Sequence, residues 1–209
     1  MRRIGVLGGT FDPVHRGHIV MARYARRMLG LDEVLFVPCY APPHRGGKPA
    51  RGSPWDRYAM TALAVSASPG LGISPVELEA GRKMYALEML RELQKKNRRA
   101  RLVFLMGEDS LYDLPTWWKA KKLVEQFDFA VFRRPVRKPP LPAYIERRLR
   151  VWKKKSSLPA ERRVYLLSNR VVPLSSTDVR RALRRNVRDG CGVPSLVLSY
   201  LRKRGLYRA

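Results

Sequence analysis

Residues 1–18 read MRRIGVLGGTFDPVHRGH, and the rest of the chain is best understood from this stretch. The apolar run from Ile4 to Leu7 is ended by Gly8 and Gly9, and a helical pattern begins only after Pro13. This order predicts a strand, a tight turn and a helix. Because glycine has no Cβ, such a turn can approach a ligand closely and direct backbone N–H groups at an oxyanion. The stretch therefore predicts an anion-binding site.

Two histidines stand at the mouth of the predicted helix. His15 and His18 are three residues apart, so they share one face once the first helical turn has formed. The positive end of the helix adds its charge to theirs. A buried strand followed by a tight turn and two surface histidines is the structural alternative. The glycine pair, Asp12-Pro13 and the His-x-Gly-His spacing together favour the anion site.

Length and composition indicate one globular domain covering residues 1–209. A hydrophobic content of 45% is enough for a core, and we expect a basic variable insert at 136–163 and a C-terminal helical part at 175–209. No apolar run is long enough to span a membrane and the N-terminus lacks a secretory pattern, so we expect a cytoplasmic protein without a membrane partner. Cys39 and Cys191 have no zinc-like spacing and are expected to be free thiols.

The charge of the chain is unusual. Lysine and arginine number 43 against 17 acidic residues, which gives a formal net charge of +26 and a pI near 11.1. Such a balance predicts attraction to polyanions, which include nucleic acid, anionic membranes and nucleotide phosphates. Charge alone does not choose among them, and many of these side chains are expected simply to be solvated.

The following elements predict an α/β fold. A helical pattern from Gly17 to Leu29 ends at Gly30, and Glu33 to Val37 is a short apolar strand. Strand, helix and strand in succession predict a parallel sheet with a right-handed crossover. We expect a Rossmann-like, doubly wound parallel sheet with helices on both faces and a small C-terminal helical part.

Further elements follow from the same patterns. The strands are expected at 71–76, 101–106, 129–132 and 164–167. The helices are expected at 54–67, from 85 through 93, at 116–127 with Thr116 as N-cap, and at 193–203, and another helix begins near Asp178. Residues 136–163 are either a loop with one basic amphipathic helix, carrying Ile145, Leu149 and Trp152, or a docking surface.

Several polar groups follow predicted strands, where α/β sheets bind their ligands. Gly107 and Asp109 follow one strand, and a carboxylate there suits ribose hydroxyls, although Asp109 is equally suited to cap a helix. Residues 39–54 form a loop that carries His44 and Arg45 and has a basic surface loop as its alternative reading. The run Ser175, Ser176, Thr177 with Arg180 is suited either to helix capping or to a triphosphate.

A family resemblance rests on these residues. The run from Gly8 to His15, followed by His18, resembles the opening of the nucleotidyltransferase superfamily that carries an H-x-G-H motif. The sequence of this segment is most similar to that of the bacterial nicotinate-nucleotide adenylyltransferases. Four later motifs occur in that family's order, so the resemblance spans nearly the whole chain: Pro42-Pro43-His44-Arg45, Gly107-x-Asp109-Ser110, Pro115-Thr116-Trp117-Trp118 and Ser175-Ser176-Thr177-x-x-Arg180.

The resemblance implies a function and a set of site residues. It implies adenylyl transfer from ATP to nicotinate mononucleotide, with Mg²⁺ held mainly by the ATP phosphates. The implied catalytic residues are His15, His18, His44 and Arg45. The implied ATP-binding residues are Gly8, Gly9, Thr10, Phe11, His15, His18, Gly107, Asp109, Ser175, Ser176, Thr177 and Arg180. The implied substrate-binding residues are Asp12, His44, Tyr85, Ala86, Trp117, Trp118 and Arg134; none is implied as a metal ligand.

The aromatic assignments remain the most open. Tryptophan stacks well on a flat, electron-poor pyridine ring, and we assign this role to Trp117, which is nearer the predicted helix start. Where the family has Ser-Tyr-Thr, this chain has Met84, Tyr85 and Ala86, so a hydroxyl is lost but the backbone amide of Ala86 remains. Helical periodicity alone favours Tyr85 as a core aromatic.

Three other functions are compatible with parts of the sequence. A phosphopantetheine adenylyltransferase and a cytidylyltransferase would use the same fold, although the tryptophan pair argues against the former. A basic RNA-binding module would account for the net charge, and 136–163 would be its location. The sequence has no zinc motif, RNP motif or regular aromatic spacing to support it, so nucleic-acid binding is not the favoured interpretation.

Overall fold

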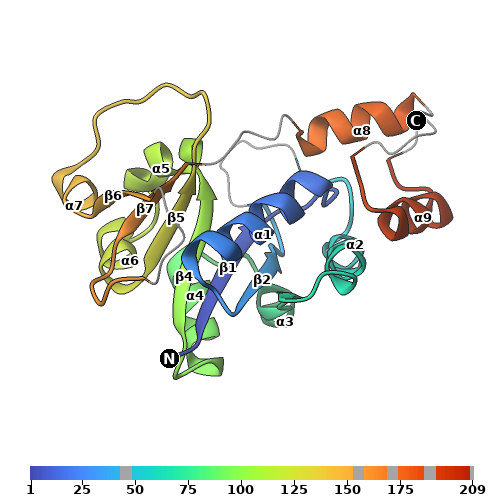
Figure 1. Cartoon of the computed structure of the whole chain (residues 1–209). Helices are drawn as coiled ribbons and strands as arrows, with labels where there is room; N and C mark the ends of the chain where they lie inside the picture. Colours follow the sequence, from blue (N-terminus) through green and yellow to red (C-terminus); the bar gives the residue numbers. More distant parts are fainter. Residues whose placement is uncertain (43–48, 153–157, 169–173, 186–191, 208–209) are drawn as a thin grey trace. The chain divides into compact units, whose positions relative to one another are not determined.

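The computed structural model describes residues 1–42, 49–152, 158–168, 174–185 and 192–207 (Figure 1). The chain forms two compact units. The first unit comprises Met1–Gly8, Ala22–Val34 and Tyr85–Val171. The second unit comprises Gly9–Met21, Leu35–Met84 and Val172–Ala209.

The strands and helices alternate along most of the chain. The strands are β1 (Arg3–Gly9), β2 (Glu33–Pro38), β3 (Leu71–Ile73), β4 (Arg101–Gly107), β5 (Asp128–Phe132), β6 (Leu149–Trp152) and β7 (Val164–Leu167). The helices are α1 (Arg16–Leu29), α2 (Pro54–Ser66), α3 (Val76–Ala80), α4 (Ala86–Lys96), α5 (Glu108–Asp113), η1 (Leu114–Thr116), α6 (Ala120–Gln126), α7 (Ala143–Glu146), α8 (Ser176–Arg184) and α9 (Ser195–Arg204).

The strands of the first unit pair in parallel. β1 pairs with β4, with Arg3 opposite Arg101 and Leu7 opposite Leu105. β4 pairs with β5, β5 with β7, and β7 with β6, all in parallel. All five residues of β5 are buried, as are the first six of β4. Parallel strands are covered on both faces, which is why they appear in the sequence as continuous apolar runs.

The strand order fixes where ligands are expected. Among the described residues the sheet has seven strands in the order β3-β2-β1-β4-β5-β7-β6. The chain proceeds in one direction from β1 to β2 and β3, and in the other from β4 onward, so the order reverses between β1 and β4. The carboxyl ends at such a reversal are the usual ligand site of an α/β sheet. Gly107 ends β4. The predicted α/β fold with a parallel sheet is confirmed.

A buried charge cluster lies at the opposite, amino-terminal ends of the first unit's strands. Asp128 is 0% exposed and accepts hydrogen bonds from Nε and Nη2 of Arg101, at 2.6 and 2.8 Å. Nη1 of Arg162 and the backbone N of Arg163 donate to the same carboxylate, each at 2.9 Å. The hydrogen bond to Asp128 raises the pKa of Arg101. The buried carboxylate is therefore fully paired, as a charge in the interior must be.

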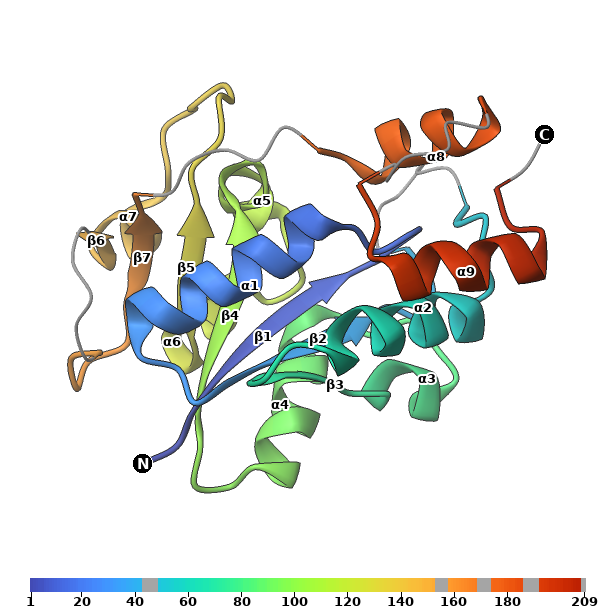
Figure 2. The ribbon, with the colours of Figure 1, turned by 45° about the vertical axis from the view of Figure 1, so that its right-hand side comes forward.

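In the second unit, α2 packs beside α9 (Figure 2). The Oγ of Ser53 accepts from the backbone N of Asp56 at 3.0 Å, and Pro54 occupies the first turn, as predicted from the sequence. The Asp56 carboxylate also accepts from Tyr200 Oη at 2.7 Å and Arg204 Nε at 3.3 Å, both on α9. Burial opposes ionisation of Asp56, but the hydrogen bonds from Ser53 and Tyr200 and the charge of Arg204 lower its pKa overall.

Three sequence-based predictions of secondary structure are wrong. Thr116 does not cap a helix through 127, because it ends η1, its Oγ1 donates to Asp113 O, and α6 begins only after Lys119. The amphipathic helix expected over Ile145, Leu149 and Trp152 is instead the short helix α7 followed by strand β6. The strand expected at 71–76 ends at Ile73, and α3 follows. For Leu149–Trp152, pairing with β7 overrides the local pattern.

Candidate active site

The turn after β1 has a tightly fixed backbone. Phe11 adopts a positive φ of 49°, the Asp12-Pro13 bond is cis, and the Phe11 side chain is buried. A Cβ added to Gly9 would lie 3.1 Å from the Phe11 ring, which is closer than ordinary van der Waals contact. The backbone N of Cys39 donates to Gly9 O at 2.9 Å and so holds the turn from its other side. Gly8, Gly9 and Thr10 remain partly exposed, as an anion-binding turn requires.

His15 and His18 face each other at the start of α1. Their rings are stacked with centroids 3.7 Å apart and planes inclined by 26°. The backbone N of His15 donates to Nδ1 of His18 at 3.2 Å, and the backbone N of His18 donates to His15 O at 3.0 Å. His15 is buried, whereas His18 is half-buried and has the edge of its ring against Phe11, at 5.0 Å. The predicted shared face of the two histidines is present.

The carboxylate of Asp12 joins three segments of the second unit. Its oxygens accept from the backbone N of Arg51 at 3.0 Å and of Gly52 at 2.9 Å. Oδ1 also accepts from Tyr207 Oη at 2.5 Å. Asp12 is only 7% exposed, so the three donors replace the water that an ionised carboxylate would otherwise bind.

The N-terminus of α8 is attached to the same turn. Oγ of Ser175 caps the helix by accepting from the backbone N of Asp178 at 3.1 Å. Oγ of Ser176 donates to Pro13 O at 3.0 Å, and Nη1 of Arg180 donates to Asp12 O at 2.6 Å. The hydrogen bond from Ser175 is the main cause of a lowered pKa for Asp178, and the charge of His15 adds a smaller contribution. The H-x-G-H segment and the Ser-Ser-Thr segment therefore lie together.

A cavity of about 480 Å³ lies at this junction in the second unit. Five predicted residues line it: Thr10, Asp12, Ser176, Thr177 and Arg180. Its remaining walls include three arginines that the sequence analysis missed, Arg51, Arg181 and Arg184. One face of α8 carries residues 177, 180, 181 and 184, at the spacing i, i+3, i+4, i+7. This spacing is the sequence signal that could have identified Arg181 and Arg184. His15, His18 and Ser175 do not line this cavity, although they belong to the segments that form it.

A buried arginine holds the loops around this cavity. Arg57 is 1% exposed, and its guanidinium donates to three backbone oxygens: Thr10 O at 2.8 Å, Tyr40 O at 2.9 Å and Gly52 O at 3.2 Å. Cys39 lies beside it, and burial raises the pKa of the Cys39 thiol, which is free. No sequence signal marked Arg57, since it is one charged residue within an ordinary helical pattern.

The first unit carries a second group of predicted residues. Gly107 ends β4, and a Cβ there would lie 2.2 Å from Oδ1 of Asp109, so a side chain at this position would require the Asp109 carboxylate to move. Asp109 and Arg134 are both about half exposed, with Oδ1 and Nη1 3.6 Å apart. The backbone N of Arg134 donates to the buried carboxylate of Glu108 at 2.9 Å. The ends of β4 and β5 thus present one carboxylate and one guanidinium to solvent.

The aromatic residues of the first unit correct one prediction. Tyr85 is 45% exposed and its ring is stacked on that of Trp118, with centroids 5.3 Å apart, so it is not a core residue as periodicity predicted. Trp118 is 38% exposed, and Lys119 Nζ lies 4.2 Å from its ring centroid. Trp117 is half-buried with its edge toward Phe104. Ala86 is the first residue of α4, so its backbone N–H has no partner within the helix.

Two of the predicted catalytic residues and one predicted thiol cannot be placed. His44, Arg45 and Cys191 lie outside the described residues. Over the described ranges, no three His, Cys, Asp or Glu side chains are grouped so that they could hold a metal ion. Over the same ranges, no helix is both long and apolar enough to cross a bilayer.

The sequence and the fold have relatives among known proteins. A family model described as Cytidylyltransferase-like matches residues 6–182. A probable nicotinate-nucleotide adenylyltransferase from Thermomicrobium roseum is 36% identical over 209 residues, covering 100% of this chain and 92% of that protein. One from Gloeobacter violaceus is 38% identical, covering 98% of this chain and 96% of that protein.

The fold agrees with this comparison. A solved structure of Plasmodium falciparum nicotinic acid mononucleotide adenylyltransferase complexed with NaAD matches with a TM-score of 0.74 at 17% identity, over 99% of this chain and 98% of that one. The resemblance inferred from the first eighteen residues is confirmed by these matches. On the identity and coverage of its relatives, the chain belongs to the nicotinate-nucleotide adenylyltransferase family of nucleotidyltransferases.

Proposed function

We propose that this enzyme transfers the adenylyl group of ATP to nicotinate mononucleotide, giving nicotinate adenine dinucleotide and pyrophosphate, a step of NAD biosynthesis. The names of its full-length relatives support the reaction. On this chain, the observation that carries the proposal is the cavity lined by Thr10, Ser176, Thr177 and four arginines. Such a hollow at a helix N-terminus suits a triphosphate.

The reaction requires positioning and charge neutralisation more than proton transfer. A phosphate oxygen of nicotinate mononucleotide, already an anion at neutral pH, attacks the α-phosphorus of ATP. The new P–O bond forms as the bond to the oxygen bridging α and β breaks, and that oxygen leaves with pyrophosphate. No general base is needed, because the nucleophile carries no proton that must be removed.

The second unit supplies the groups for the triphosphate. Ser176 and Thr177 contribute hydroxyls and backbone N–H groups at the N-terminus of α8, next to Ser175 at the cap. Arg180 contributes a guanidinium that grips two oxygens of the β- and γ-phosphates. His15 and His18 are assigned to the α-phosphate with Gly9, Thr10 and Phe11 at the turn, and His44 and Arg45 to neighbouring phosphates. Gly8, which ends the first segment of the first unit, is also assigned to ATP binding. The reason for these assignments is that the transition state needs hydrogen-bond donors at the phosphate oxygens on which negative charge develops.

The first unit supplies groups for a nucleoside and for an aromatic ring. Asp109, after Gly107, is assigned to ribose hydroxyls and Arg134 to phosphate, since both side chains are half exposed at strand ends. Trp117 is assigned to the pyridine ring beside the stacked pair of Tyr85 and Trp118. The free N–H of Ala86 is assigned to the pyridine carboxylate. Asp12, in the second unit, is assigned to substrate binding because it lines the cavity.

Mg²⁺ is expected to arrive with ATP. The described residues offer no cluster of three protein ligands for it, whereas the phosphate oxygens of ATP are ligands that it prefers. When bound to the ATP phosphates, Mg²⁺ would neutralise part of their negative charge. The chain's own part is to hold the phosphates through the hydroxyls, N–H groups and arginines already named.

An acceptor and donor comparison tests the proposal. Purified protein is incubated with ATP and, in turn, nicotinate mononucleotide, nicotinamide mononucleotide and phosphopantetheine, and pyrophosphate release is measured; CTP then replaces ATP. We expect the highest kcat/KM with ATP and nicotinate mononucleotide. Turnover that is faster with phosphopantetheine, or with CTP in place of ATP, contradicts the proposal. The comparison of nicotinate with nicotinamide mononucleotide shows how Ala86, which stands where the family has Thr, affects the choice of acceptor.

A further inference from the structure

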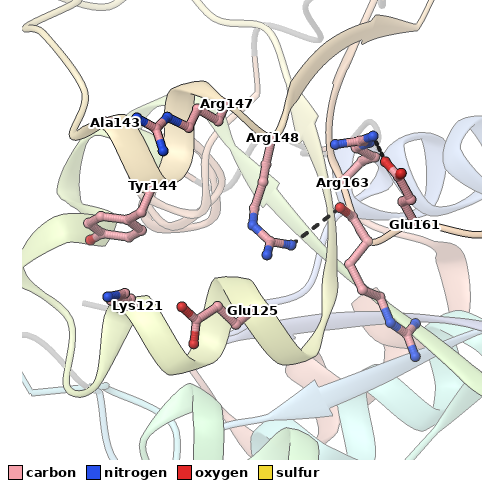
Figure 3. Close-up of a pocket in the computed structure, with 9 residues that line it drawn as sticks. Lys121, Glu125, Ala143, Tyr144, Arg147, Arg148, Glu161 and Arg163 are labelled. Carbon is pink, nitrogen blue, oxygen red and sulfur yellow. Dashed lines mark hydrogen bonds and ion pairs between the residues drawn. The ribbon is translucent and has the colours of Figure 1, made fainter.

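A second cavity, of about 720 Å³, lies within the first unit (Figure 3). Its walls come from α6, from α7 and from the segment that leads into β7. These are the amino-terminal ends of β5 and β7, whereas Asp109 and Arg134 follow the carboxyl ends of β4 and β5. β5 separates the two ends by about 13 Å at 3.3 Å per residue. The cavity is therefore a different site from the one formed by Asp109 and Arg134.

The charge on the cavity wall is not balanced. Five lysine and arginine side chains line it against two glutamates, Glu125 and Glu161. Arg163 is paired with Glu161, and Arg162 donates to the buried Asp128. By contrast, neither Lys121 nor Arg147 forms an ion pair with any residue that the structure describes. The wall thus keeps positive charge that is available to an anion.

The geometry indicates how these groups would meet one ligand. Figure 3 shows Tyr144 of α7, and Arg148 just after α7, extending toward α6, on which Lys121 and Glu125 lie one turn apart. Arg148 uses one N–H on Arg162 O, at 3.4 Å, which leaves other donors of its guanidinium for a ligand. The volume falls in the range of about 300–1,000 Å³ that is usual for small-molecule sites.

Two of the side chains restrict the class of anion. Tyr144 is half-buried, and burial raises the pKa of its hydroxyl, so the ring is neutral and offers a stacking surface. Glu125 would repel bare phosphate, but a carboxylate accepts hydrogen bonds from ribose hydroxyls. Cations, an aromatic face and a hydroxyl acceptor in one hollow are the features of a site for a nucleotide rather than for inorganic phosphate.

We propose that this cavity is a second nucleotide-binding site. Lys121, Arg147 and Arg148 hold the phosphate of a ribonucleotide, Glu125 accepts from its ribose, and Tyr144 stacks on its base. A free mononucleotide and one unit of single-stranded RNA present the same chemistry to these five side chains. The proposal does not depend on the adenylyl-transfer reaction, and it gives a specific location to part of the chain's large positive charge.

A binding experiment with charge-matched variants tests the site. Fluorescence anisotropy follows a labelled eight-residue oligouridylate, and unlabelled UMP and inorganic phosphate compete with it. Lys121→Ala/Arg147→Ala removes two cations from the cavity. Arg98→Ala/Arg99→Ala is the control, because both arginines are exposed in the same unit, lie outside the cavity and remove the same charge. Adenylyl transfer by every variant reports that the protein is folded.

We expect the cavity variant to bind oligouridylate at least tenfold more weakly at 50 mM salt than the control. The slope of log K against log salt should fall by about 0.7, since the site neutralises one phosphate of the strand and each neutralised phosphate of a single strand contributes about 0.7. Tyr144→Ala should weaken oligouridylate binding as well. Competition by UMP identifies a mononucleotide as sufficient, and its failure identifies the strand as the ligand; both outcomes support the site if the cavity variant alone is affected.

Three outcomes overturn the proposal. Equal losses in the cavity and control variants would show that binding follows net charge rather than this site. An absence of binding by both oligouridylate and UMP would show that the site takes no nucleotide. Competition by inorganic phosphate as effective as that by UMP would show that ribose and base contribute nothing. None of these outcomes bears on adenylyl transfer, which is measured separately.

Discussion

Tyr207 donates a hydrogen bond from Oη to Oδ1 of Asp12 over 2.5 Å, although the two residues are 195 positions apart. Asp12 belongs to the turn after β1, and Tyr207 follows α9 near the end of the chain. The same carboxylate holds the backbone N–H groups of Arg51 and Gly52. The end of the chain is therefore part of the support of the proposed triphosphate site.

Tyr207→Phe should destabilise the protein by about 1–2 kcal/mol, because a buried carboxylate loses one of its donors. Urea unfolding followed by tryptophan fluorescence measures the change. Tyr58→Phe is a suitable comparison, since the structure gives the Tyr58 hydroxyl no hydrogen bond to a described residue. Equal stability of the two variants would show that the Tyr207 hydrogen bond contributes nothing.

The same tyrosine predicts a loss of stability in alkali. Burial, followed by the hydrogen bond to Asp12, raises the pKa of Tyr207 above its ordinary value of 10.0. Above about pH 10 the unfolded chain releases this proton while the folded protein keeps it, so stability falls as pH rises. Burial likewise raises the pKa of Tyr165 to about 12. Unfolding free energies between pH 9 and 11 should fall less steeply in Tyr207→Phe than in the parent protein.

His18→Ala should lower turnover about a hundredfold or more, as loss of one transition-state donor does. His18 is half-buried and does not belong to the buried core, so the fold should persist. Steady-state kinetics gives the turnover, and circular dichroism checks the fold. A folded variant with near-normal turnover would remove His18 from the mechanism.

Arg180→Ala should raise the KM for ATP and lower kcat, so that kcat/KM falls by about 100-fold. The substitution removes both the guanidinium that binds the phosphates and its hydrogen bond to Asp12 O. Arg185→Ala is the matched control, because Arg185 is exposed on the C-terminal side of the same helix and does not line the cavity. Arg180→Lys should fall between them. Comparable kinetics for the two alanine variants would count against a triphosphate at this cavity.

The tryptophan assignment is tested by comparing two neighbours. Trp117→Ala should raise the KM for nicotinate mononucleotide about tenfold and leave the KM for ATP unchanged, because stacking on one ring is worth about 1–1.5 kcal/mol. Trp118→Ala should have a smaller effect, since Trp118 stacks on Tyr85. A larger effect from Trp118→Ala would transfer the assignment to that residue.

The sequence was most informative where function depends on local chemistry. Glycines at a turn, two histidines at a helix start and hydroxyls before α8 all have local reasons for their positions, and the structure brings the last two segments together through Ser176 and Pro13. The apolar runs predicted the buried strands for the same reason.

The sequence was least informative where a residue acts through distant partners. Arg57 binds carbonyl oxygens from three segments, and no spacing along the chain reveals such a contact. Tyr85 follows a core-like periodicity but is stacked on Trp118 at the surface, because the helical pattern does not show what faces it. The segment 149–152 has a helical pattern but pairs with β7, which was not evident locally.

The contacts of Arg57 have an evolutionary consequence. All three of its partners are main-chain oxygens, which every amino acid possesses, so the hydrogen bonds themselves need no particular side chain at positions 10 and 40. Position 52 differs, because a Cβ added to Gly52 would lie 2.9 Å from Tyr207 Oη and 3.3 Å from Arg57 Cγ. The residues at positions 10 and 40 can therefore change without loss of these hydrogen bonds, while one guanidinium keeps their backbone in place. A change at Arg57 itself, by contrast, would release the backbone of three segments at once.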